Sequence, residues 1–206
     1  LAVLTTRYPE AEEEDRIIFG VFVTGEAIEG DDTNAGYVVA KEGYAIELTP
    51  DEAKQIMKDD ELVDQEQKKI ENICFQLLIQ QQPVARDLRT ITAAMKMVTD
   101  MERIGDQAAD IAELTIMMAD SPYLLNVEHI KKMSAETVMM LMQAVQAYVE
   151  RDMKKAQEVI EHDDIVDELF VKVKTDLIEV MRNNADYAEH AADLLMVNKY
   201  LERIGD

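Results

Sequence analysis

Two identical five-residue motifs, ERIGD, occur one hundred residues apart, at Glu102–Asp106 and at Glu202–Asp206. A related pair precedes them, with DELVD at Asp60–Asp64 and DDIVD at Asp163–Asp167. Each motif places two acids four residues apart, and helix residues at this spacing share one face, with Cβ atoms roughly 5–6 Å apart. The sequence therefore contains four acidic pairs in two repeats, and their members are Asp60, Asp64, Glu102, Asp106, Asp163, Asp167, Glu202 and Asp206.

If each half folds as an antiparallel helical hairpin, its two acidic pairs lie at the same level along the helix axes. Facing residues in such a hairpin have numbers that average to the position of the turn. In the first half the residue numbers of Asp64 and Glu102 average to 83, and so do those of Asp60 and Asp106. Residue 83 is a proline, which breaks a helix. In the second half both pairs average to 184.5, beside Asn184 in the RNNAD turn. The spacing predicts that the four acids of each half lie together on adjoining helices.

Four carboxylates in one patch repel one another, and each like-charged i,i+4 pair costs roughly 0.2–0.5 kcal/mol even when it is exposed. A bound multivalent cation is the simplest way to make the arrangement favourable, and an all-oxygen ligand set favours iron, manganese, magnesium or zinc. The glycine in each ERIGD agrees with this interpretation. Gly105 and Gly205 each cost roughly 1 kcal/mol relative to alanine inside a helix, but they let a neighbouring helix or a hydrated metal come close. The competing interpretation is a solvated acidic face, since 43 of the 206 residues are acidic.

The elements that must position these acids are helices. A helix start is predicted at LTPDEA, with Thr49 as N-cap, Pro50 at the first helical position and Glu52 completing a capping box. No strand pattern follows it. Apolar periodicity of about 3.6 residues predicts helices over 50–81, 84–119, about 126–151, 153–183 and 186–206. The connections between them have the length found between antiparallel neighbours, so we expect a mainly α helical bundle.

Residues 1–49 have a different composition. They contain five of the seven glycines and three β-rich runs, RIIFGVFV at 16–23, GYVVA at 36–40 and YAIEL at 44–48, with GDDTNAG as a turn-rich connection. This segment predicts a small β meander or hairpin. The expected organisation is thus a β-rich segment of unassigned origin over 1–49, a first helical repeat over 50–120 and a second over 121–206.

The charge balance restricts the class of partner. A net charge of -22 disfavours nucleic acid and anionic lipid as direct partners, and it suits cations or a basic protein surface. Cys74 is the only cysteine, so an intrachain disulfide is excluded and a reducing cytosol is expected. No apolar run reaches the roughly 18 residues that a membrane-spanning helix needs, so we expect no direct membrane insertion.

From about residue 51 to residue 206 the chain resembles the PhoU family, the cytoplasmic regulators of phosphate uptake and phosphate signalling. QQPVARDLRTITAAMKMVTDMERIGDQAADIAE is similar to the most recognisable stretch of that family, and NKYLERIGD resembles its second copy. The resemblance implies two three-helix repeats whose E/DxxxD motifs hold multinuclear metal clusters of iron or zinc, with manganese or magnesium possible. Carried over by position, one site would be Asp60, Asp64, Glu102 and Asp106, and the other would be Asp163, Asp167, Glu202 and Asp206.

The resemblance also implies a cytoplasmic, non-enzymatic regulator that contacts a phosphate ABC transporter and the sensor histidine kinase of a phosphate-responsive two-component system. A homodimer is expected. The chain differs from the family pattern in two places. The helix that should precede residue 51 is replaced by β-rich sequence, and the sequence stops at Asp206, within the second motif.

Two alternatives remain open from the residues themselves. The first is a purely structural helical interaction module that binds no metal. The second is a carboxylate-bridged di-iron enzyme, which needs Glu-x-x-His pairs. No glutamate stands three residues before any of the three histidines, which are His129, His162 and His190. His162 lies next to Asp163 and could add a nitrogen ligand to the second site or be an ordinary surface histidine.

Overall fold

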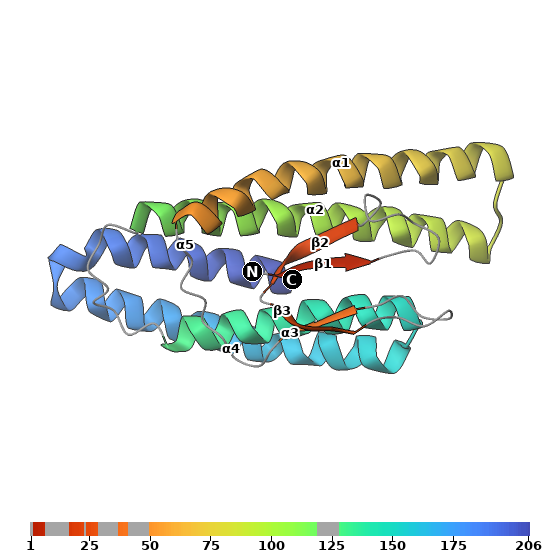
Figure 1. Cartoon of the computed structure of the whole chain (residues 1–206). Helices are drawn as coiled ribbons and strands as arrows, with labels where there is room; N and C mark the ends of the chain where they lie inside the picture. Colours follow the sequence, from red (N-terminus) through yellow and green to blue (C-terminus); the bar gives the residue numbers. More distant parts are fainter. Residues whose placement is uncertain (1, 7–16, 23, 29–36, 41–49, 119–127) are drawn as a thin grey trace. The chain divides into compact units, whose positions relative to one another are not determined.

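The computed structural model of the chain is mainly α-helical, as predicted (Figure 1). It describes residues 2–6, 17–22, 24–28, 37–40, 50–118 and 128–206. The helices are α1 (Pro50–Gln81), α2 (Arg86–Met118), α3 (Glu128–Glu150), α4 (Met153–Asn183) and α5 (Ala188–Gly205), with a 3-10 turn, η2 (Ala185–Tyr187), before α5. No described helix contains a stretch apolar enough and long enough to cross a bilayer.

The breaks between helices follow from local chemistry. α1 begins at Pro50 as predicted, whereas Thr49 and the side chain of Glu52 lie outside the described residues. The turn between α1 and α2 contains Pro83, which lacks the N–H that would continue α1, and the residues on either side of the turn, Gln82 and Ala85, have φ of 45° and 46°. The predicted break at Pro83 is therefore confirmed.

The second predicted break, at Asn184, is confirmed as well. Asn184 has extended backbone (φ -151°, ψ 109°), and its N–H still donates to Val180 O at 3.0 Å. Its side-chain oxygen accepts from the N–H of Asp186 at 3.0 Å, which caps η2. At the start of α4, Asp152 caps in the same way by accepting from the N–H groups of Lys154 and Lys155.

Among the described residues of the N-terminal segment, four short strands form two separate two-stranded antiparallel sheets. β1 (Ala2–Thr6) pairs with β2 (Ile17–Phe22), and β3 (Thr24–Ile28) pairs with β4 (Tyr37–Ala40). β2 and β4 confirm the strands predicted within 16–23 and 36–40, whereas β1 and β3 are strands that the sequence did not predict. The runs YAIEL and GDDTNAG lie outside the described residues.

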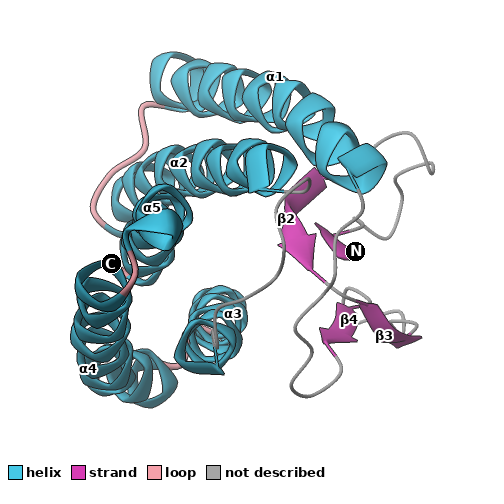
Figure 2. Cartoon of the chain, turned by 90° about the vertical axis from the view of Figure 1, so that its left-hand side faces the viewer, coloured by secondary structure: helices cyan, strands magenta, loops and turns pink. Residues whose placement is uncertain are grey.

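The helices divide between two compact units. The first contains α1 from Lys54 onward and α2 as far as Ala109, and the second contains the rest of α2 with α3, α4 and α5. The predicted domain boundary near residue 120 stays a prediction. In the second unit α3, α4 and α5 pack on one another (Figures 1 and 2). Their apolar stripes, spaced by three, four and seven residues, meet in one core, made of Ile130, Met133, Met140, Val159, Val166, Leu169, Val173, Leu177, Ala191, Val197 and Leu201.

In the first unit α1 and α2 lie side by side as a hairpin (Figure 2). The turn between them spans residues 82–85 and contains Pro83. The side chains buried in these two helices include Ile56, Cys74, Val98 and Met101. Cys74 is a free thiol whose pKa is raised, first by burial and then by the charge of Glu71, so it is a core residue as predicted. The hairpin supports the two acidic motifs of the first half on facing helices.

Candidate metal sites

The structure places the eight predicted acids on two pairs of helices, four acids on each pair. The first quartet is Asp60, Asp64, Glu102 and Asp106, on α1 and α2. The second quartet is Asp163, Asp167, Glu202 and Asp206, on α4 and at the end of α5. The first quartet lies within the first unit and the second quartet within the second unit, so each can be described by itself.

Gly105 of α2 lies close to side chains of α1 in the first quartet. A Cβ atom at this position would lie 3.0 Å from Asp60 Oδ1 and 3.2 Å from Val63 Cγ1. Both atoms belong to α1, so the missing side chain lets α1 approach the backbone of α2. This contact places Asp60 of α1 at the same level along the hairpin as the ERIGD motif of α2.

The charges of the first quartet act on one another. The pKa of Glu102 is raised above its ordinary value, mainly by burial and then by the carboxylates of Asp106, Asp64 and Asp60. The carboxylates of all three other members thus act on Glu102, and Asp60 lies beside Gly105 of the same motif. Lys68 opposes this effect by lowering the pKa of Glu102, and its Nζ contacts Asp64 Oδ2 at 3.0 Å.

The second quartet repeats this arrangement. A Cβ atom at Gly205 would lie 3.5 Å from Asp163 Oδ1 and 3.5 Å from Val166 Cγ1, which are ordinary contact distances. The pKa of Asp163 is raised by burial first, and then by the other three members of the quartet together with the neighbouring Asp164. An Asp and a Val three residues apart therefore face the motif glycine in both repeats.

Two hydrogen bonds from side chains to backbone carbonyls hold α5, and with it Glu202, at a fixed position along α3 and α4. The side chain of Thr137 on α3 donates to Leu201 O at 3.5 Å. On the other side, Asn198 Nδ2 donates to Phe170 O of α4 at 3.1 Å. Both side chains are buried, so solvent does not compete strongly for these bonds. They tie α5 to α3 and to α4 within one turn of Glu202.

Two lysines next to the quartets were missed by the sequence analysis. Besides Lys68, Lys199 Nζ makes a close ion pair with Glu202 Oε2 and lies 5.6 Å from the centroid of the Phe170 ring. The ion pairs of both lysines could have been predicted from the sequence, because side chains at i,i+4 and i,i+3 spacing meet along a helix. The contact with Phe170 crosses from α5 to α4 and could not be predicted from spacing.

His162 interacts with the third helix. Its Nε2 lies 2.8 Å from Glu136 Oε2 on α3, and both side chains are 21% exposed. The imidazole thus contacts a carboxylate outside the second quartet. Neither of the two roles predicted for His162, a ligand or a plain surface histidine, includes this contact between α3 and α4.

The donor set fits hard or borderline cations, because each quartet offers only carboxylate oxygens. The pKa values of Glu102 and Asp163 are raised first by burial and then by the neighbouring carboxylates, and a bound cation would offset both effects. Within the described part of the chain, no three Asp, Glu, His or Cys side chains enclose a position for one ion. Metal binding therefore requires the carboxylates of a quartet to turn toward each other, and it stays a prediction.

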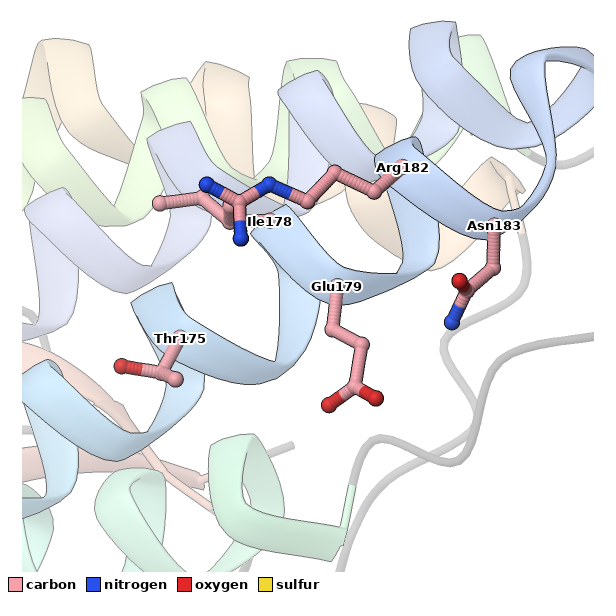
Figure 3. Close-up of a pocket in the computed structure, with 5 residues that line it drawn as sticks. All are labelled: Thr175, Ile178, Glu179, Arg182 and Asn183. Atoms are coloured by element: carbon pink, nitrogen blue, oxygen red, sulfur yellow. The ribbon is translucent and has the colours of Figure 1, made fainter.

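A hollow of about 500 Å³ on the C-terminal part of α4 has a different character (Figure 3). It is lined by Thr175, Ile178, Glu179, Arg182 and Asn183, all from one helix. In Figure 3 the side chains of Glu179 and Arg182 extend in different directions and do not converge on a common point. Arg182 belongs to the last turn of α4, where a cation interacts favourably with the helix dipole. No member of either quartet lines this hollow.

Comparisons with known proteins agree with the repeat architecture. The family model described as the PhoU domain matches residues 45–115 and 130–206. A phosphate-specific transport system accessory protein PhoU homolog of Clostridium acetobutylicum is 40% identical over 155 residues, which cover 75% of this chain and 71% of that protein. The homolog of the same name from Borreliella burgdorferi is 32% identical over 160 residues, covering 75% and 72%.

Solved structures show the same similarity. The phosphate transport system regulatory protein PhoU of Streptococcus pneumoniae superposes with a TM-score of 0.70 at 25% identity, covering 76% of this chain and 73% of that one. PhoU of Pseudomonas aeruginosa gives a TM-score of 0.72 at 28% identity, covering 76% of each chain. On the evidence of the domain match, these relatives and the two repeated helical hairpins, the chain belongs to the PhoU family.

Proposed function

We propose that this chain is a metal-binding, non-enzymatic regulator of a phosphate-specific transport system. The observation that supports the role most directly is membership of a family whose relatives are named phosphate-specific transport system accessory proteins. The observation that supports metal binding is the pair of carboxylate quartets, each gathered around a motif glycine. The proposed location is the cytoplasm, where the protein would act as a homodimer.

The quartets would act by fixing the angle between helices. Each quartet joins two helices that are otherwise held by apolar contacts and, between α4 and α5 of the second unit, by the hydrogen bond from Asn198 to Phe170 O. A cation shared between the two helices would remove the repulsion among the carboxylates and make one crossing geometry the most stable. The state of the quartets would then set the shape of the faces that contact a phosphate ABC transporter and a sensor histidine kinase.

Elemental analysis tests the metal part of the proposal. The purified chain should contain more than one iron, zinc or manganese ion per molecule. A variant with Glu102→Ala, Asp106→Ala, Glu202→Ala and Asp206→Ala should lose them, because it lacks half of the ligands in each quartet. An absence of metal in the unsubstituted chain, even after reconstitution with iron, manganese and zinc, would contradict metal binding and favour a structural interaction module.

Complementation tests the regulatory part separately. Phosphate uptake and phosphate-responsive transcription would be measured in a Clostridium acetobutylicum strain that lacks its own homolog, with and without this chain. We expect the unsubstituted chain to restore repression at high phosphate. Glu102→Ala should restore it less well if the crossing angle depends on metal, and Glu179→Ala, outside both quartets, serves as control. Loss of metal from Glu102→Ala without any change in repression or in transporter binding would contradict the proposed mechanism.

A further inference from the structure

The acids of the two quartets are repeated in the sequence, but the lysines beside them are not. Lys68 extends from α1 and contacts Asp64, whereas Lys199 extends from α5 and contacts Glu202. The repeat-equivalent of Lys68 is Val171, and that of Lys199 is Thr99. Each quartet therefore has a lysine in contact with one of its carboxylates, and this lysine comes from the DxxxD helix in the first quartet and from the ERIGD helix in the second.

The two lysines differ in how firmly they are held. The side chains of Lys68 and Asp64 are 64% and 41% exposed, and exposed pairs of this kind are weak. The side chains of Lys199 and Glu202 are 40% and 17% exposed, so the second pair is screened less by water. Lys199 Nζ also lies 5.6 Å from the Phe170 ring centroid, within the range of a cation–π interaction.

We infer that Lys68 and Lys199 are internal counter-ions that a metal ion must displace from the quartets, and that the first quartet consequently binds a given metal ion more tightly than the second. An ammonium group on a carboxylate oxygen excludes a cation from that oxygen by charge and by volume. Displacing Lys199 costs more, because it gives up a partly buried ion pair and the contact with Phe170. This inference rests on the proposed metal binding and concerns its regulation.

Calorimetric titration of the full chain with MnCl2 measures each quartet in turn. Glu202→Ala with Asp206→Ala leaves only the first quartet, and Glu102→Ala with Asp106→Ala leaves only the second. Each lysine is then changed to methionine in the background that keeps its own quartet. Methionine retains helix propensity and the apolar stem, so only the charge is removed.

We expect the Kd for Mn²⁺ at the first quartet to fall by about two- to fivefold in Lys68→Met, the range that an exposed ion pair allows. At the second quartet we expect a fall of about five- to tenfold in Lys199→Met, because the cation–π contact adds to the ion pair. The matched control is Lys154→Met, which removes the same charge from an exposed i,i+4 pair with Glu158 away from both quartets. Its Kd should change by less than about twofold.

An unchanged or weakened Mn²⁺ affinity in both Lys199→Met and a second neutral variant, Lys199→Gln, would overturn the inference while leaving metal binding intact. A second quartet that binds Mn²⁺ more tightly than the first would overturn the proposed order. No binding of Mn²⁺ by the unsubstituted chain would overturn the metal-binding proposal and this inference together. Circular dichroism of each variant establishes that the helices are retained, so that a change in Kd reports on the lysine.

Discussion

At the scale of single residues, the two motif glycines have different tolerance for a side chain. A Cβ at Gly205 would meet Asp163 and Val166 at ordinary distances, and alanine is intrinsically more favourable than glycine in a helix. Gly205 is the last residue of α5, where the difference in propensity is smaller than in a helix interior, so Gly205→Ala should raise the free energy of unfolding by up to about 0.5 kcal/mol. At Gly105 the same change forces a Cβ to within 3.0 Å of Asp60 Oδ1 and 3.2 Å of Val63 Cγ1.

Overpacking of this kind costs more than the gain in propensity, so Gly105→Ala should lower the free energy of unfolding by about 1 kcal/mol. Urea denaturation of the metal-free proteins measures both changes. Equal stabilisation by the two alanines would mean that α1 does not approach α2 at Gly105 as closely as the structure shows.

A second residue-scale prediction concerns pH. The pKa of Glu102 is raised in the fold, chiefly by burial and then by Asp106, Asp64 and Asp60, so folded Glu102 binds its proton more tightly than the unfolded chain does. Between the ordinary glutamate pKa and the raised value, the folded state holds more protons. Stability from this group is therefore present at acid pH and is lost as the pH rises through the raised value.

Glu102→Gln should remove that loss. In chelator-treated protein we expect the variant to melt at a higher temperature than the unsubstituted chain at about pH 7, with the difference shrinking toward about pH 4. Thermal melts across this range measure it. Glu179→Gln, which changes an exposed carboxylate outside both quartets, is the matched control. A lower melting temperature for Glu102→Gln at pH 7 would contradict the repulsion among the quartet.

At the scale of elements, the position of α5 along α4 depends on the buried side-chain amide of Asn198. Asn198 is fully buried, and its Oδ1 has no hydrogen-bond partner among the described residues, although its Nδ2 donates to Phe170 O. The equivalent position in the first repeat is Val98, which is also buried. Asn198→Val should raise the free energy of unfolding by about 1 kcal/mol, because an unsatisfied buried acceptor is removed while Phe170 O keeps its place in the helix ladder.

Asn198→Asp is the opposite case, since a buried carboxylate without a cationic partner should lower the free energy of unfolding by about 3 kcal/mol. Urea denaturation measures both variants. If Asn198→Val were destabilising by more than about 1 kcal/mol, the amide would contribute more through its bond to Phe170 than its unsatisfied oxygen costs.

The elements also show how far the sequence predicts this protein. Helix positions and both hairpin turns could be predicted, because Pro83 and Asn184 stop helices by local chemistry and the apolar spacing is regular over long segments. The gathering of the quartets followed from those turns, since a hairpin relates residue numbers directly. β3 could not be predicted, because the three central residues of TGEAI are Gly, Glu and Ala, which are depleted in strands. The contact of Lys199 with Phe170 depends on which side chains face each other across helices, which spacing along one helix does not determine.

At the scale of the whole molecule, a net charge of -22 opposes every compact arrangement of the chain. Two kinds of cation should relieve this repulsion differently. Sodium chloride screens all exposed charges, so raising it should increase the melting temperature of the unsubstituted chain and of the four-alanine variant at Glu102, Asp106, Glu202 and Asp206 by similar amounts. MnCl2 at millimolar concentration, added at constant ionic strength, should increase the melting temperature of the unsubstituted chain further.

The size of the further increase follows from mass action. A ligand at a hundred times its Kd stabilises the folded state by about 2.7 kcal/mol per site, which corresponds to roughly 5 °C or more for a chain of this size. The four-alanine variant should lose this increase and keep the response to sodium chloride. Chelation should return the unsubstituted chain to its metal-free melting temperature. An equal response of the two proteins to MnCl2 would show that the ion acts on the general surface charge, and the quartets would then be helix-packing motifs.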